Sequence, residues 1–268
     1  MAKRHKNPSG LRNAFDGESY LLDFFRDFIE PECTLLLPED DATEGALKAM
    51  LDADGWADLT AKGEGAPDFA SEANKLMVEV MRVDDHEQRP GFNPLRRYEG
   101  EILKDEDGGL HTLMATCGLK AGLLLNVTTD LSSEEDHSYC FYLESFRRIV
   151  GKHAAKAQGY RESNPDKRLI FFVFDESTAY LACSDEGATR RAGEEVIGQP
   201  HWFFLDSEFL KVIRKCGADY FVWFTPFKHA WLSDGSHVDA PTVCVFDCAR
   251  FDVDAIEYDS ARVVSSEE

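Results

Sequence analysis

The apolar run from Leu76 to Val83 constrains the fold of this chain more than any other stretch. Its length and its valines are typical of a buried β-strand. Side chains alternate between the two faces of a strand, so Glu79 shares one face with Met77 and Met81. A lone carboxylate between methionines loses several kcal/mol of solvation unless it meets a hydrogen bond, a cation or a metal ion. The sequence therefore predicts a partner for Glu79 inside the fold.

Length and composition indicate a folded globular protein. A chain of 268 residues forms one large domain or two small ones, and a hydrophobic content of 43% favours a sizeable core over disorder. We find no internal repeat and no clear linker. We therefore expect a flexible N-terminal tail over residues 1–14, a single α/β domain over 15–258 and a second tail over 259–268.

The net charge of −21 limits what the chain attracts at long range. Such a field repels a polyanion, so nucleic acid could bind only through local basic patches or bound metal. The acidic excess also suits a salt-rich environment or a basic protein partner. No apolar run approaches the length of a membrane span, and the basic N-terminus lacks the apolar segment of a secretory signal. We expect no membrane partner.

Seven cysteines without a CxxC pair favour a reducing compartment. Several stand inside apolar strand or helix patterns, as buried thiols do. Cys244 and Cys248, four residues apart, are a weak metal candidate, and core packing explains them more simply. We therefore expect a cytoplasmic protein.

A glutamate in the predicted helix that opens at Asp41 is expected to point inward. Asp41 and Glu44 have the spacing of a capping box, and Gly55 suits the end of the helix. Glu44 also shares a face with Leu47 and Leu51. Two compatible interpretations stay open: Glu44 caps its own helix, or it contributes to a site.

The most convincing helix runs from Ser132 to about Gln158. His153 falls within its apolar stripe, where a histidine satisfied inside the core is the simplest interpretation. Its basic residues fall largely on the other faces, where they could meet phosphates, although a solvated helix face is the simpler explanation; they are Arg147, Arg148, Lys152 and Lys156.

The run Arg168–Asp175 reads as a central strand covered on both faces. Asp175 and Ser177 stand at its carboxyl end, where α/β sheets tend to place ligands, or they simply form a turn. The polar segment 84–86 follows the strand that ends at Val83. Its oxygen and nitrogen atoms could also serve as ligands, or the segment could simply end the strand. Further strands are expected over 180–183, 202–205, 220–224 and 242–246, and helices over 18–30 and 207–216.

The order of these elements resembles the core of the PD-(D/E)XK nuclease superfamily, which has the restriction-endonuclease-like fold. Glu44 matches the helix glutamate of that superfamily, Pro67-Asp68 matches its Pro-Asp pair, and Glu79-Val80-Met81 matches the (D/E)XK tripeptide. The resemblance covers roughly residues 41–175. It implies an α/β fold whose core is a mixed central sheet flanked by helices, with a C-terminal α/β elaboration over about 176–258.

The resemblance also implies Mg²⁺-dependent hydrolysis of phosphodiester bonds in nucleic acid, with Mn²⁺ as a substitute. Asp68, Glu79 and the Val80 carbonyl would hold the ion, which activates water and offsets charge on the phosphate, and Glu44 would hold a water. The sequence departs from the motif at Met81, which replaces the lysine and carries no charge. Lys120, in the following strand region, could take that role.

Three functions therefore stay open. The first is a Mg²⁺-dependent endonuclease or phosphodiesterase with Glu44, Asp68, Glu79 and Lys120 as catalytic residues. The second is a non-catalytic nuclease-like scaffold that acts as a binding or regulatory module, which Met81 and the net charge favour. The third is an unrelated α/β domain in which Glu79 is the structural partner of an arginine.

Overall fold

The computed structural model describes residues 17–29, 33–63, 65–87, 137–183, 198–231 and 237–266. In chain order its elements are α1 (Glu18–Phe28), β1 (Thr34–Leu37), α2 (Asp41–Leu51), β2 (Trp56–Asp58), η2 (Thr60–Lys62), β3 (Phe69–Ser71), β4 (Leu76–Val83), α4 (Tyr139–Ser163), β5 (Arg168–Asp175), β6 (Tyr180–Cys183), β7 (Gly198–Pro200), η4 (Phe203–Leu205), α5 (Ser207–Ile213), β8 (Tyr220–Phe224), β9 (His229–Trp231), β10 (His237–Asp239), β11 (Val243–Asp247), η5 (Ser260–Arg262) and β12 (Val263–Ser265).

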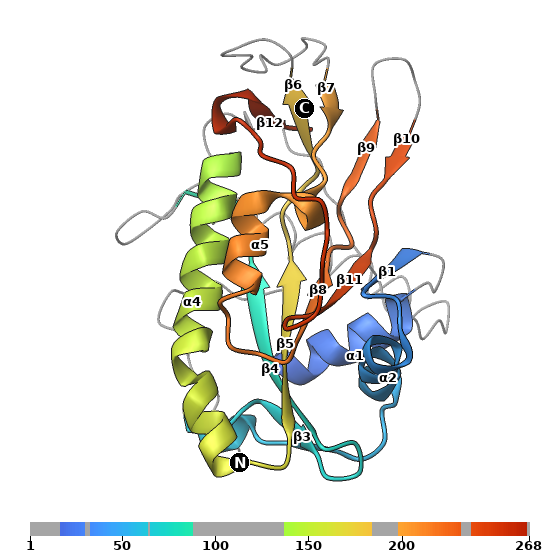
Figure 1. Ribbon diagram of the computed structural model, residues 1–268, viewed down its shortest axis with the longest axis vertical. Helices are drawn as coiled ribbons and strands as arrows, with labels where there is room; N and C mark the ends of the chain where they lie inside the picture. Colours follow the sequence, from blue (N-terminus) through green and yellow to red (C-terminus); the bar gives the residue numbers. More distant parts are fainter. Residues whose placement is uncertain are drawn as a thin grey trace, which may run out of the picture.

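A mixed sheet forms the centre of the molecule (Figure 1), and over the described residues it has seven strands in the order β1-β11-β8-β5-β4-β3-β2. The strands β4, β5 and β8 are mutually parallel. The strands β2, β3 and β4 form an antiparallel meander, and β11 runs antiparallel to β8. Helix α4 lies between β4 and β5 in the sequence, as the crossover between parallel neighbours requires. The predicted mixed α/β architecture is confirmed.

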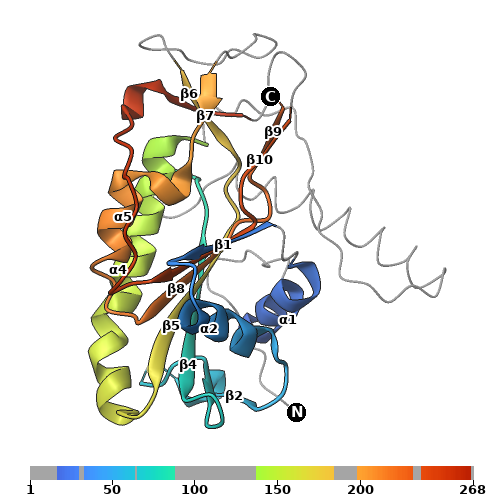
Figure 2. The ribbon, with the colours of Figure 1, turned by 45° about the vertical axis from the view of Figure 1, so that its right-hand side comes forward.

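Helices cover both faces of this sheet (Figures 1 and 2). On one face α1 and α2 pack with Val78 and Val80 of β4 into one hydrophobic core. On the other face α4 and α5 pack with Met77 and Met81 into a second core. The alternation of β4 side chains therefore divides the interior into two apolar layers, as its period predicts.

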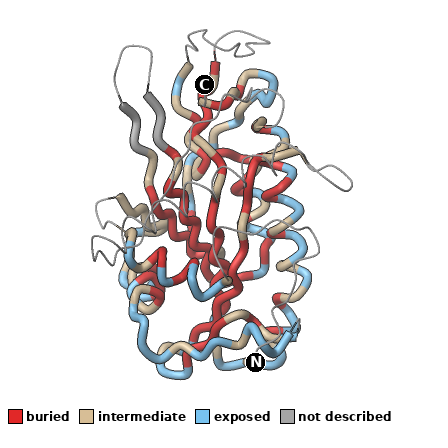
Figure 3. The backbone as a smooth tube through the Cα atoms, turned by 180° about the vertical axis from the view of Figure 1, so that it is seen from behind, coloured by how far each residue is buried: buried red, intermediate tan, exposed pale blue. Residues whose placement is uncertain are grey.

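Aromatic side chains hold the layers to the sheet. Phe25 of α1 packs edge-on against Phe172 with ring centroids 5.0 Å apart, and it contacts Phe224 at 5.3 Å. On the opposite face Phe146 of α4 packs at 4.6 Å from Trp223. Burying each such ring contributes about 1.5–3 kcal/mol. Figure 3 shows the buried backbone concentrated along the strands between the helices.

Smaller β-structures lie beyond the main sheet. The strands β12, β6 and β7 form a second sheet, and β9 pairs with β10 in a hairpin, both at the upper end of the view in Figure 1. Strand β12 pairs antiparallel with β6, within the segment from residue 259 that we expected as a tail. Of the described helices, none combines the length and apolar character that crossing a bilayer demands.

Some local expectations were wrong. The segment 202–205 is not a strand but a 3₁₀ turn, because the N–H groups of Leu205 and Asp206 donate to carbonyls three residues back. Asp40, not Asp41, caps α2: its carboxylate accepts from the N–H groups of Ala42 and Thr43. The start of the helix expected from residue 132, together with every element expected between residues 88 and 136, lies outside the described residues.

Candidate acidic site between the sheet and α4

Asp68 and Glu79 lie side by side on the face of the sheet that α4 covers. Phe69 pairs with Val78 across the antiparallel β3–β4 ladder, so Asp68, one residue earlier, lies opposite Glu79. The Asp68 Oδ2 atom accepts the backbone N–H of Val80 at 2.7 Å, and its backbone carbonyl accepts the N–H of Leu59 at 2.7 Å. The side chain of Asp68 thus occupies the place where the main chain of β3 would continue the ladder.

Three side chains of α4 surround the Glu79 carboxylate. The Oε1 atom of Glu79 lies 2.6 Å from His153 Nδ1, 3.0 Å from the Tyr160 hydroxyl and 3.6 Å from Lys156 Nζ. Residues 153, 156 and 160 share a helix face because they are three and four positions apart. Glu79 is only 2% exposed, and these contacts supply the partner that its sequence position requires.

The second oxygen of Glu79 is different. Glu79 Oε2 is buried and has no hydrogen-bond partner among the described residues. An unsatisfied oxygen on a buried carboxylate costs about 1–3 kcal/mol, and more when it is charged. It is therefore the atom at which a bound ion or water would stabilise the site most.

The Asp68 carboxyl has an unusual proton affinity. Burial and the neighbouring Glu79 carboxylate raise its pKa to about 7, against the lowering effects of the Val80 N–H and of the Lys156 ammonium. The opposing effect of Lys156 shows that this one cation acts on both carboxylates. Asp68 consequently changes charge near neutral pH.

The donor atoms fit a hard divalent cation in kind. A strand residue directs its N–H and C=O to the same side, so the Val80 carbonyl points toward β3 together with the N–H that Asp68 accepts. Asp68, Glu79 Oε2 and that carbonyl are oxygen donors of the type that Mg²⁺ prefers. The described residues contain no group of three or more histidine, cysteine, aspartate or glutamate side chains arranged to hold a metal. Two carboxylates and one carbonyl are therefore the oxygen donors that the described part of the chain offers here.

Glu44 does not join this pair, so the expected inward orientation is wrong. Its carboxylate is 46% exposed and pairs with Lys48 at 2.8 Å along α2. Helix α2 packs in the core layer of Val78 and Val80, on the face of the sheet away from Glu79. The buried positions of α2 are Thr43, Ala46, Leu47 and Met50. The buried face of the helix is therefore rotated by about one residue from the face that was predicted to include Glu44.

Among the described residues, α4 supplies an ammonium group to the site. Lys120 lies outside the described residues, and Met81 is 2% exposed within the core that α4 covers. Lys156 was expected among the solvated bases of its helix, yet its side chain is 27% exposed and reaches Glu79. Its spacing from His153, three residues earlier on the apolar stripe, was the available signal.

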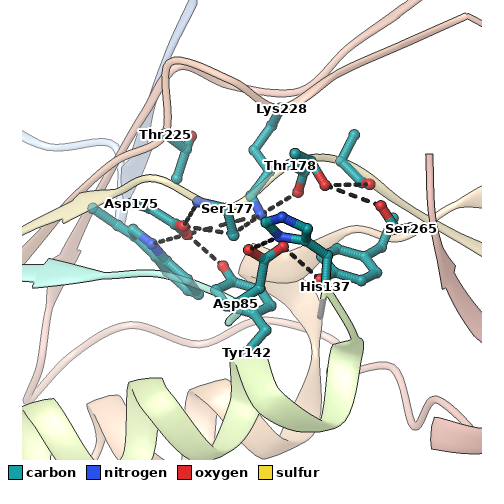
Figure 4. Close-up of polar contacts among 12 residues, drawn as sticks. Asp85, His137, Tyr142, Asp175, Ser177, Thr178, Thr225, Lys228 and Ser265 are labelled. Atoms are coloured by element: carbon teal, nitrogen blue, oxygen red, sulfur yellow. Dashed lines mark hydrogen bonds and ion pairs between the residues drawn. The ribbon is translucent and has the colours of Figure 1, made fainter. Parts of the chain in front are cut away.

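A second polar cluster lies at the carboxyl ends of β4 and β5, where the sequence suggested ligands (Figure 4). Asp175 accepts hydrogen bonds from the Tyr142 hydroxyl, from Trp223 Nε1 at 2.9 Å, and from both the N–H and the hydroxyl of Ser177. Lys228, 4% exposed, donates to Ser177 and to the Thr178 carbonyl at 2.6 Å. Sequence patterns gave no indication of Lys228, which follows β8 by four residues.

Asp85 belongs to the same region and is held by two partners. His137 Nδ1 and the Tyr180 hydroxyl each lie 2.6 Å from one of its carboxylate oxygens. Burial alone would raise the pKa of Asp85, but the His137 charge and these hydrogen bonds outweigh it and lower the pKa to about 2. Protein groups surround both aspartates, so this cluster ties β4, β5 and α4 together and is a structural network.

The fold and the site together define a mixed α/β protein with an acidic pair beneath a long helix. Comparisons of the chain with protein-family models, with curated proteins and with solved structures find no match.

Proposed function

We propose that this chain is a divergent PD-(D/E)XK-like nuclease that hydrolyses phosphodiester bonds of nucleic acid with Mg²⁺. The observation that carries the proposal is the Asp68–Glu79 pair with an ammonium group beside it: Lys156 Nζ lies 3.6 Å from Glu79 Oε1. A pair of carboxylates for a cation, with one lysine in reach, is the combination that the resemblance requires. Lys156 takes the role for which Lys120 was the candidate.

The element order supports the same interpretation. Helix α2 is followed by the antiparallel strands β2, β3 and β4, then by α4 and by β5, which is parallel to β4. This sequence of elements covers residues 41–175, the range of the resemblance. The absence of Glu44 from the site means that the proposal does not include it.

Each residue has a defined part in this proposal. Asp68, Glu79 Oε2 and the Val80 carbonyl would hold Mg²⁺, which supplies an activated water and positive charge opposite the scissile phosphate. Lys156 offsets the negative charge that develops on the phosphate. His153 and Tyr160 hold the Glu79 carboxylate in one orientation through Oε1 and leave Oε2 available.

The substrate would approach along α4. Lys152 is exposed one turn before Lys156, and Arg148 is exposed one turn before Lys152. Three basic residues at intervals of four lie on one stripe of the helix. Against a net charge of −21 this stripe is a local attraction only, so binding should weaken steeply as salt rises.

Cleavage assays test the proposal. Purified protein is incubated with plasmid and with single-stranded oligonucleotides in Mg²⁺, in Mn²⁺ and in EDTA. We expect metal-dependent cleavage that falls by about 100-fold or more in Asp68→Asn and in Lys156→Met, because each removes a charged contact to the reacting groups. Lys48→Met, which removes an exposed lysine of α2 on the other face of the sheet, is the matched control and should leave cleavage unchanged. Activity that is unchanged in Asp68→Asn would refute the proposal.

Two observations favour a second candidate, a non-catalytic scaffold that binds nucleic acid or a protein partner. Two groups of α4 already use Glu79 Oε1, and Met81 replaces the motif lysine. Calorimetry with Mg²⁺ and Mn²⁺ separates the candidates. Binding that depends on Glu79 and is accompanied by turnover supports the nuclease, whereas no turnover on any substrate supports the scaffold.

A further inference from the structure

Two cysteines that are distant in sequence meet at the edge of the α4–α5 layer. Cys216 follows α5 in the chain, and Cys248 directly follows β11. Their Sγ atoms are 3.9 Å apart, although 32 positions separate them in the sequence. The backbone is fixed at this point, because Cys248 N–H donates to the Asp219 carbonyl at 3.0 Å and Asp219 N–H donates to the Leu169 carbonyl at 2.8 Å.

The surroundings of the two sulfurs are unequal. Cys216 Sγ accepts the backbone N–H of Ala218 at 3.4 Å. The Arg161 guanidinium is close by, bonded to the Gly217 carbonyl and to Asp219 at 2.9 Å each. The contact from Cys248 and the Ala218 N–H lower the pKa of Cys216 despite its burial, whereas the contact with Cys216 and burial raise the pKa of Cys248. The Ala218 N–H and the nearby Arg161 guanidinium thus favour a thiolate at Cys216.

A cavity borders one member of this pair. Cys216 lines a cavity of about 360 Å³ between α4 and α5, whose apolar wall includes Val150 and Ala154 and whose edge carries Lys215. Cys248 is partly exposed. Cys244, by contrast, is completely buried in β11, where burial raises the pKa of its thiol.

We propose that Cys216 and Cys248 are a redox modification site, which a hydroperoxide such as hydrogen peroxide oxidises to an intramolecular disulfide. The site lies outside the acidic pair and does not depend on nuclease activity. Its carrying observation is the geometry of two facing thiols beside a cavity, one of which accepts a backbone N–H.

The reaction has two balanced steps. The Cys216 thiolate attacks one peroxide oxygen, so that an S–O bond forms, the O–O bond breaks, and the departing hydroxide takes a proton to become water. Cys248 then loses its proton and attacks the Cys216 sulfur, so that the S–S bond forms and a second water leaves. Two thiols are oxidised by two electrons in total, and one peroxide is reduced to two waters.

The experiment maps disulfides in the full-length protein after exposure to hydrogen peroxide. Tryptic cleavage after Lys215 and Lys228 places Cys216 in one peptide, while cleavage after Lys228 and Arg250 places Cys244 and Cys248 in another. We expect these peptides to become linked, with a mass two hydrogens below their sum, and to separate after dithiothreitol. Fragmentation between Phe246 and Asp247 should assign the link to Cys248.

Three variants sharpen the test. Cys248→Ser should leave Cys216 as a sulfenic acid that dimedone traps, whereas Cys216→Ser should leave Cys248 without such an adduct. Cys140→Ser removes an exposed thiol of α4 and should leave the disulfide yield unchanged. The proposal is overturned if Cys140 or Cys33 is oxidised while Cys216 and Cys248 stay reduced at the same peroxide dose, or if the link involves Cys244.

Discussion

The backbone N–H of Val80 donates to the Asp68 carboxylate at 2.7 Å, so a side chain completes the β3–β4 ladder where the main chain of β3 turns away. This bond fixes Asp68 beside Glu79 and occupies only one of its two oxygens. The arrangement concentrates negative charge under α4 and makes the region sensitive to protons, to cations and to the position of one lysine.

The stability of the protein should fall as pH rises through the pKa of Asp68. The folded pKa of about 7 lies above the value of the unfolded chain, so the folded state binds more protons between about pH 4 and pH 7. The stabilisation is complete below about pH 4 and is lost as pH rises through 7. It corresponds to at most about 4 kcal/mol, which solvent screening reduces to roughly 1–2 kcal/mol.

Asp68→Asn isolates this contribution, because an amide oxygen still accepts the Val80 N–H but does not titrate in this range. Urea unfolding at pH 5 and pH 8 should show a smaller decline for Asp68→Asn than for the wild type. If the free energy of unfolding changes equally with pH in the two proteins, the pKa of Asp68 is not raised by folding.

Moving the positive charge should preserve cleavage. Lys156→Met alone removes the ammonium beside Glu79, and adding Met81→Lys returns one to the same face of β4, two residues beyond Glu79. We expect the double variant to recover at least about a tenth of wild-type cleavage, at a stability cost of a few kcal/mol for a buried lysine. The recovery is measured as the initial rate of plasmid cleavage, normalised to the folded fraction that circular dichroism gives. No recovery in a folded double variant would mean that Lys156 has a role that position 81 cannot fill.

Glu44→Ala should not change metal binding. The Glu44 carboxylate is bonded to Lys48 on a helix that packs against the other face of the sheet. Calorimetric titration with Mg²⁺ should give the same affinity for this variant as for the wild type, and Glu79→Gln should weaken it about tenfold or more. A matching loss in Glu44→Ala would require a shift of α2 toward the acidic pair.

The ammonium of Lys228 should stabilise the fold through Asp175. Its Nζ atom lies 3.9 Å from Asp175 Oδ2 and 4.2 Å from the centre of the Tyr142 ring. Lys228→Met leaves a buried carboxylate without its cation, which should cost about 3–5 kcal/mol in urea unfolding. Asp175→Asn should cost less in the Lys228→Met background than in the wild type, by about 1 kcal/mol or more. Additive losses would assign the effect of Lys228 to packing alone.

The sequence was sufficient to predict the layers of sheet and helix, and it was sufficient to predict the two carboxylates of the site. The apolar runs of β4 and β5 and the stripe of α4 follow from periods that local chemistry imposes, so these elements were predictable. Asp68 and Glu79 were predictable as neighbours because each sits in or beside one of two consecutive strands. The contact between Lys156 and Glu79 spans 77 positions and depends on the rotation of α4 about its axis.

That rotation is set by tertiary packing, which local patterns do not encode. The stripe assigned to α4 included His153, but a turn of the helix by one position decides whether Lys156 faces water or the sheet. The same limit explains Glu44, whose helix was predicted while its orientation was wrong. Lys228 was out of reach for another reason: it lies in a connection between strands, where no period exists.

The placement of α2 and α4 on opposite faces of the sheet makes that sheet a partition. Substitutions among the phenylalanines around α1 act on the apolar layer of that face, whereas the side chains that contact Glu79 come from α4 on the opposite face. Mutations on the α1 side therefore probe packing, and mutations on the α4 side probe the surroundings of the acidic pair.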